Sequence, residues 1–267
     1  MSTFTALETL ARVGFVVKGV LYTVVGALAL QLAISAGGRI TGTSGALTTV
    51  LEQPFGRGLL VVAAIGLFGY ATWRVLQGIF DPDRLGRGWG AIYKRVTYVL
   101  RGALHAALSY QAVQLYRGLA VGSDSSEQEV AAEAFQWPLG DWLVVLVGLG
   151  MIAFAFSEAY DAVKGRLAHN LDIGDLRREA GNWAVVVSRC GIAARAVVFV
   201  LLGWAIVVSG WSRDPSEVGS IASSLRMLAQ QPGILGRWLF AATAAGLIAY
   251  GFYEMIHARY LRIRPVH

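Results

Sequence analysis

Cysteine and histidine are scarce in this chain, and their scarcity excludes several classes of function. The 267 residues contain one cysteine, Cys190, so an internal disulfide and any paired-cysteine motif are excluded. Four histidines are present, none at the spacing of a metal-ligand motif. Nucleophile-elbow (GxSxG), Walker A and HExxH patterns are also absent. We therefore predict a protein that is not an enzyme, with no cofactor and no metal, in which Cys190 is a small packing residue.

Charge is scarce as well, and long hydrophobic runs take its place. Only 15% of the residues are charged, 55% are hydrophobic and the mean hydropathy is +0.54. Crossing the ~30 Å hydrocarbon core of a bilayer takes about 20 helical residues. Six apolar runs have this length, which predicts an all-α, six-transmembrane-helix bundle: Phe15–Ile34, Leu59–Phe80, Val96–Tyr116, Trp142–Tyr160, Ile192–Ser209 and Trp238–Ile256.

The basic residues predict the orientation of these spans. The side that holds both termini and the two linkers between hairpins carries 17 of the 23 Lys and Arg residues, and the other side carries six. Under the positive-inside rule, a multi-pass protein of the plasma (inner) membrane with cytoplasmic N- and C-termini is expected. Basic loops beside anionic membrane lipids also explain the pI near 9.7, so no nucleic-acid partner is predicted. Four tryptophans fall at the predicted outer boundary: Trp137, Trp142, Trp211 and Trp238.

The chain repeats itself three times. A basic residue opens the first apolar run of each repeat and another follows six positions later: Arg12 and Lys18, Arg95 and Arg101, Arg189 and Arg195. The second runs align as Gly66/Gly150/Gly246, Tyr70/Phe154/Tyr250 and Arg74/Glu158/Glu254. Periodicity on this scale indicates repeated supersecondary units. We predict three membrane hairpins, residues 8–80, 91–161 and 185–257, in a pseudo-three-fold arrangement.

The outer loop of each hairpin contains a short amphipathic pattern. Apolar residues at helical spacing after a serine predict interfacial helices near residues 44–53, 125–136 and 220–230. A proline follows each pattern, and we predict that it lies in the first turn of the next span, where its missing N–H is harmless: Pro54, Pro138 and Pro232.

Residues that step by four place unusual side chains on one face of each span. A candidate charge layer consists of Lys18, Arg74, Arg101, Glu158, Arg195 and Glu254, and a candidate aromatic and histidine layer lies one turn deeper: Tyr22, Tyr70, His105, Phe154, Phe199 and Tyr250. Within repeats 2 and 3 we expect the ion pairs Arg101–Glu158 and Arg195–Glu254, whereas Lys18 meets Arg74. Small residues nearer mid-membrane are expected to permit close helix approach: Gly26, Gly66, Gly150, Gly203 and Gly246.

The charge layer has two interpretations. Its cations lie only about 9 Å inside the first basic residue of each repeat, so they can reach the headgroups as anchors and structural ion pairs. Alternatively, the surplus of two positive charges forms a cytoplasmic vestibule that holds an anion or a lipid headgroup beside Lys18 and Arg74. His105, the only histidine in a predicted span, is expected to be a hydrogen-bonded interior residue rather than a ligand.

Two stretches resemble a known bacterial family. The motif Ala11-Arg12-Val13-Gly14-Phe15, then Lys18-Gly19-Val20-Leu21-Tyr22 and Gly26, precedes Gln53-Pro54-Phe55-Gly56 and Gly66-Leu67-Phe68-Gly69-Tyr70. Together they are similar to domain of unknown function 1206, a pair of membrane helices that occurs three times per chain. The chain departs from the pattern at Ala196 and Phe154. The resemblance implies the fold and the membrane location but no activity.

Three functional hypotheses follow. The first is a non-enzymatic structural or accessory protein, with a membrane complex as a possible partner. The second is a channel or transporter for a small anion or a lipid-like solute, which uses the positive layer. The third, a membrane enzyme or haem protein, lacks any supporting motif.

Overall fold

The computed structural model describes residues 3–35, 37–82, 85–86, 88–119, 125–164, 178 and 181–260, and this part of the chain contains helices and no strands. The predicted all-α class is therefore confirmed. A long, a short and a long helix follow one another three times. They are α1 (Thr3–Ala33), α2 (Thr43–Leu51) and α3 (Gly56–Phe80); α4 (Trp89–Tyr116), α5 (Ser125–Ala134) and α6 (Gly140–Val163); α8 (Asn182–Ser212), α9 (Ile221–Ala229) and α10 (Gly233–Tyr260), with the short 3₁₀ helix η1 (Pro215–Glu217) before α9.

Five of the long helices are long and apolar enough to cross a membrane: α1 from Thr9, α3, α6, α8 and α10. The protein is thus a multi-pass membrane protein. The sixth long helix, α4, has 28 residues, so its length is sufficient. It falls short in hydropathy because Arg101, His105, Gln111 and Gln114 interrupt its apolar sequence.

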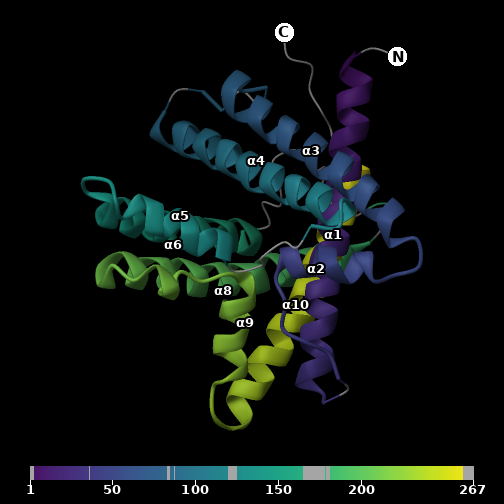
Figure 1. The fold of residues 1–267 in the computed structure, drawn as a ribbon. Helices are drawn as coiled ribbons and strands as arrows, with labels where there is room; N and C mark the ends of the chain where they lie inside the picture. The colour runs from purple at the N-terminus through teal and green to yellow at the C-terminus, as the bar shows by residue number, and fades with distance from the viewer. Residues whose placement is uncertain are drawn as a thin grey trace.

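Each long helix packs most closely on a helix of a neighbouring repeat. The closest pairs are α3 with α4, α6 with α8, and α1 with α10. In Figure 1 these pairs are visible as three two-helix arms, inclined to one another: blue, teal to green, and purple with yellow. Within a repeat, α1 also packs on α3, and α8 on α10. The second helix of a repeat therefore pairs with the first helix of the next, and the last helix returns to the first.

Glycines bring the paired backbones together. A Cβ on Gly26 would lie 2.7 Å from the Ala244 carbonyl oxygen, and one on Gly203 would lie 2.8 Å from the Gly148 carbonyl oxygen. Side chains at these positions would push α1 from α10 and α8 from α6. The predicted packing role is confirmed for these two glycines. It is wrong for Gly150, whose Cβ would meet nothing within 4 Å.

The three short helices α2, α5 and α9 occur where the loops predict them. Ser220 caps α9 and forms a capping box with Ser223, whereas Gly42 begins α2 without a side-chain cap. The prolines lie elsewhere than predicted. Each precedes its helix, and a left-handed residue follows it: Phe55 (φ 62°), Leu139 (φ 62°) and Gly233 (φ 80°). This turn redirects the chain before the helix starts. The preference of proline for the first turn of a helix gives no indication of such a turn.

Candidate functional site

The charge layer joins α1 and α10 through a buried ion pair. Lys18 and Glu254 are 3% and 2% exposed. The Lys18 Nζ donates to Glu254 Oε1 at 2.8 Å, to the Tyr250 hydroxyl at 3.1 Å and to the Tyr70 hydroxyl at 3.5 Å. The Tyr250 hydroxyl donates to the same Glu254 oxygen. Because each donor meets an acceptor, the ammonium and the carboxylate compensate each other away from water.

Glu158 is shared by two arginines. Its Oε1 accepts a hydrogen bond from Arg101 Nη2 at 2.6 Å, and its Oε2 pairs with Arg195 Nη2. The Arg101–Glu158 pair is therefore present as expected. The expected Arg195–Glu254 pair is wrong, because α8 packs more closely on α6 than on α10, and so Arg195 reaches the carboxylate of repeat 2.

Arg74 has no carboxylate partner in the part of the chain that the structure describes. Its neighbour α4 contributes Arg101, another cation, where the other two interfaces contribute an acid. Instead, Arg74 Nε donates to the Tyr70 hydroxyl and Nη1 to Gln77 Oε1, both at 2.9 Å. Its guanidinium also lies over three rings, with centroid distances of 5.1–5.3 Å: Phe15, Tyr70 and Tyr98. Ring faces replace the missing anion by cation–π attraction.

The predicted Lys18–Arg74 contact is indirect. Both cations donate to the Tyr70 hydroxyl, which lies between them. On the other side of Lys18, the guanidinium of Arg195 lies 4.5 Å from the centroid of the Tyr250 ring. The six residues of the charge layer therefore form one continuous series of side-chain contacts across all six long helices.

The aromatic layer supplies one contact at each close helix pair. Tyr22 meets Tyr250 at 4.8 Å between centroids, His105 meets Tyr70 at 4.5 Å, and Phe199 meets Phe154 at 6.2 Å. These contacts join α1 with α10, α4 with α3, and α8 with α6. The aromatic residues thus sit directly beside the charged groups and cover them, as their four-residue offset predicts.

His105 is hydrogen-bonded, as expected, and it is partly buried. Its Nδ1 lies 2.8 Å from the carbonyl oxygen of Arg101, one turn earlier in α4. Among the described residues, no group of three or more His, Cys, Asp or Glu side chains is arranged to hold a metal ion.

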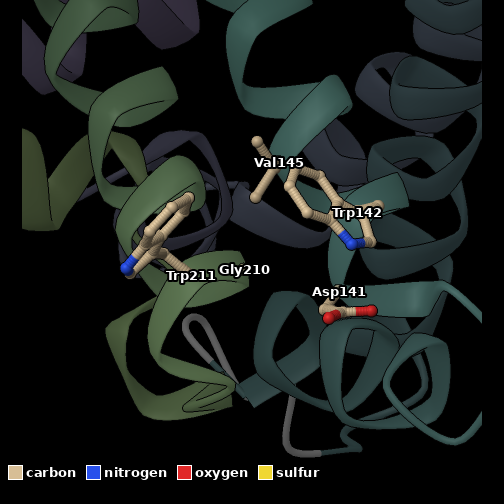
Figure 2. Close-up of a pocket in the computed structure, with 5 residues that line it drawn as sticks. All are labelled: Asp141, Trp142, Val145, Gly210 and Trp211. Atoms are coloured by element: carbon tan, nitrogen blue, oxygen red, sulfur yellow. The ribbon is translucent and has the colours of Figure 1, made fainter.

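A shallow surface cavity lies far from the charge layer. Figure 2 shows its lining at the start of α6 and the end of α8: Asp141, Trp142, Val145, Gly210 and Trp211. Asp141 pairs with Arg213 at 2.7 Å beside it. From Asp141 to Glu158 the helix rises by about 25 Å. This cavity is thus distinct from the predicted vestibule, and Lys18 and Arg74 are only 3% and 7% exposed.

Several residues of the network escaped sequence reasoning. Gln77 and His257 follow Arg74 and Glu254 by three positions, so they share a helix face with them. That spacing is the signal that was available. The sequence placed only His105 inside a predicted span. His257 also lies inside a long apolar helix, α10, where it is 3% exposed. The prediction that Cys190 is a small packing residue is also wrong, because Cys190 is exposed.

Two polar atoms near this network lack a protein partner. His257 Nε2 and Glu254 Oε2 are buried, and neither forms a hydrogen bond within the described part of the chain. The His257 ring instead lies 4.3 Å from Phe15. The Glu254 carboxylate is therefore held through one oxygen only, by Lys18 and Tyr250.

The fold and this network define a multi-pass helical membrane protein built from three repeats. The chain belongs to the family described as Domain of Unknown Function (DUF1206), whose profile matches residues 13–81, 96–165 and 190–261. It is 30% identical over 254 residues to the uncharacterized protein YxxB of Bacillus subtilis (strain 168), covering 95% of this chain and 91% of that protein. No solved structure matches the chain.

Proposed function

We propose that this protein is a non-enzymatic structural or accessory component of the plasma membrane, with six spans and cytoplasmic termini. The observation that carries the proposal is the burial of four of the six charge-layer residues: Lys18, Arg74, Arg195 and Glu254. Its cations hold carboxylates, tyrosine hydroxyls and aromatic faces of neighbouring helices. A network used in this way stabilises helix contacts and leaves few charged groups for a substrate.

The sixth span is α4, and its polar side chains explain why it is less apolar. Arg101 pairs with Glu158, His105 bonds to its own helix, and the Ser109 hydroxyl donates to the Ala64 carbonyl of α3 at 2.8 Å. Leu100 and Leu104 are 58% and 61% exposed on another side of the helix. This is the pattern of a membrane helix, in which polar side chains bond to other protein groups and apolar side chains face the lipid.

The pseudo-three-fold arrangement is supported by the recurrence of the same contacts. Each of the three close helix pairs contains one residue pair of the charge layer and one of the aromatic layer. Two helix pairs contain an ion pair, Lys18 with Glu254 and Arg195 with Glu158, whereas α3 and α4 contribute the two cations Arg74 and Arg101. An arrangement in which three equivalent helix pairs share a set of contacts suits a scaffold.

An accessory role predicts a stable assembly with other membrane proteins. After gentle solubilisation of native membranes, the protein is expected to migrate on a native gel well above the mass of the purified chain. Migration at the mass of the lone chain, under conditions in which other membrane complexes survive, would contradict the accessory role.

The second candidate is transport of a small anion or a lipid-like solute. Arg74, which has no carboxylate beside it in the described part of the chain, is the observation that favours it. Anion efflux from liposomes separates the candidates. If the protein is a scaffold, anion efflux equals that of liposomes without protein. If it is a transporter, efflux is faster, and Lys18→Ala and Arg74→Ala both reduce it.

A further inference from the structure

The second repeat is open where the first and third are closed. In repeats 1 and 3 the two long helices pack on each other, but α4 and α6 share no comparable packing among the described residues. Residues at equivalent positions of the three repeats differ in their exposed fraction. Val17 and Ala194 are each 9% exposed, and Leu100 is 58% exposed. Leu21 and Val198 are 2% and 1% exposed, and Leu104 is 61% exposed.

The facing positions on α6 are open as well. A Cβ on Gly66 would lie 3.0 Å from Val13 Cγ1, and one on Gly246 would overlap the Ala194 side chain. At the equivalent Gly150 nothing lies within 4 Å. Ala153, one turn further along α6, is exposed too. We call Leu100, Leu104, Gly150 and Ala153 the open hairpin face.

Partly exposed charges lie at the cytoplasmic end of this face. The Arg101–Glu158 ion pair bridges α4 and α6 there, and its side chains are 20% and 23% exposed. The Lys18–Glu254 side chains are 4% and 3% exposed. Because Glu158 is shared with Arg195, these three residues carry a net positive charge. Arg101 donates to no other acceptor in the described chain, so part of its guanidinium is available to a ligand.

From this combination we infer that the open hairpin face binds an anionic phospholipid. The phosphate meets Arg101, and one acyl chain lies against Leu100, Leu104 and Gly150. Guanidinium groups recognise phosphate oxygens through paired hydrogen bonds. The exposed Lys94 and Lys164, near the cytoplasmic ends of α4 and α6, favour an anionic headgroup over one that carries a choline cation.

A phospholipid fits this face better than a helix of a protein partner. A partner helix would need an acidic side chain at the depth of Arg101, about 9 Å inside Arg95. A charged residue at the centre of a membrane helix costs about 2.5–3.5 kcal/mol to insert. A phospholipid brings its charge from the interface, where the long Arg101 side chain reaches toward it. The site rests on the proposed six-span arrangement, since both α4 and α6 must lie in the bilayer.

The test is native mass spectrometry of the detergent-purified protein with equal amounts of phosphatidylglycerol and phosphatidylcholine. The wild type is expected to retain one phosphatidylglycerol in preference to phosphatidylcholine. Gly150→Leu fills the face without a clash and is expected to weaken retention by about tenfold. Arg101→Gln is expected to remove the headgroup preference, and Arg101→Lys to restore part of it. Gly58→Leu, at another glycine with open space around it, is the matched control and retains the lipid.

Two results would overturn the lipid site. One is equal retention of both lipids, unaffected by Gly150→Leu. The other is a dimer that Gly150→Leu dissociates, because a second copy would then cover the face. An incorrect six-span arrangement gives a different result, because cysteines at the two ends of α4 would then be labelled from the same side of the membrane. Ends that label from opposite sides, without selective lipid retention, reject the lipid site alone.

Discussion

At the scale of single residues, Lys18 and Glu254 illustrate how this protein keeps charges inside the membrane. Each meets the other and a tyrosine hydroxyl, and neither is more than 3% exposed. A buried pair of this kind contributes little in comparison with an apolar pair of the same shape. Removal of one partner, however, leaves an uncompensated charge.

We expect Glu254→Leu to lower the free energy of unfolding by about 3–5 kcal/mol, because Lys18 loses its only carboxylate in the described chain. The double variant Lys18→Met with Glu254→Leu should recover most of the loss. Thermal unfolding in detergent, followed by helical circular dichroism, measures both. A double variant as unstable as the single one would show that the ion pair is not what the single change disrupts.

Glu158 should be more sensitive still. Glu158→Gln leaves Arg101 and Arg195 close together without the carboxylate that they share, so repulsion adds to the lost ion pairs. We expect a larger loss of thermal stability than from Arg101→Gln, and the greatest loss from the charge reversal Glu158→Lys. Asp141→Asn is the control. Its ion pair with Arg213 is largely exposed on the arginine side, so only a small change in thermal stability is expected.

At the scale of the helices, glycines at equivalent positions of the repeats have different surroundings. Gly66 faces the side chains of Val13 and Val17 across the α1–α3 interface, whereas Gly150 faces open space. Sequence alignment makes these two positions equivalent. Only the packing of their helices distinguishes them.

Gly66→Leu should therefore lower the unfolding temperature of the purified protein, since the new side chain separates α1 from α3. Gly150→Leu should leave the unfolding temperature unchanged or raise it slightly, because leucine favours a helix more than glycine does by about 0.8 kcal/mol. Differential scanning fluorimetry in one detergent compares them directly. Equal destabilisation by both changes would mean that α4 and α6 close on each other in solution.

At the scale of the whole molecule, the number and orientation of the spans remain predictions. The exposed Cys190 is the only cysteine of the chain, so Cys190→Ser gives a background for labelling. In that background, Gly88→Cys and Arg117→Cys mark the two ends of α4. An impermeant maleimide is expected to label Arg117→Cys on intact cells and Gly88→Cys only after lysis. Labelling of both on intact cells would show that α4 does not cross the membrane.

Much of the arrangement was predictable, and the reasons are local. The positions of the long helices follow from the apolar runs, although the helices extend beyond them, and the sites of α2, α5 and α9 follow from their amphipathic patterns. The members of the charge layer follow from a four-residue step along one helix face. The partners within the layer were not predictable. Arg195 has carboxylates available in two repeats, and the choice of Glu158 depends on the close packing of α8 on α6.

An all-helical membrane protein of three repeats follows from the amino-acid sequence, because hydrophobic length and periodicity are properties of each segment alone. Three features follow only from the packing of the folded chain: which helices pair, which carboxylate each arginine meets, and the opening between α4 and α6 in repeat 2. These outcomes depend on contacts between segments far apart in the chain, and the aligned glycines 66, 150 and 246 carry no sign of the difference.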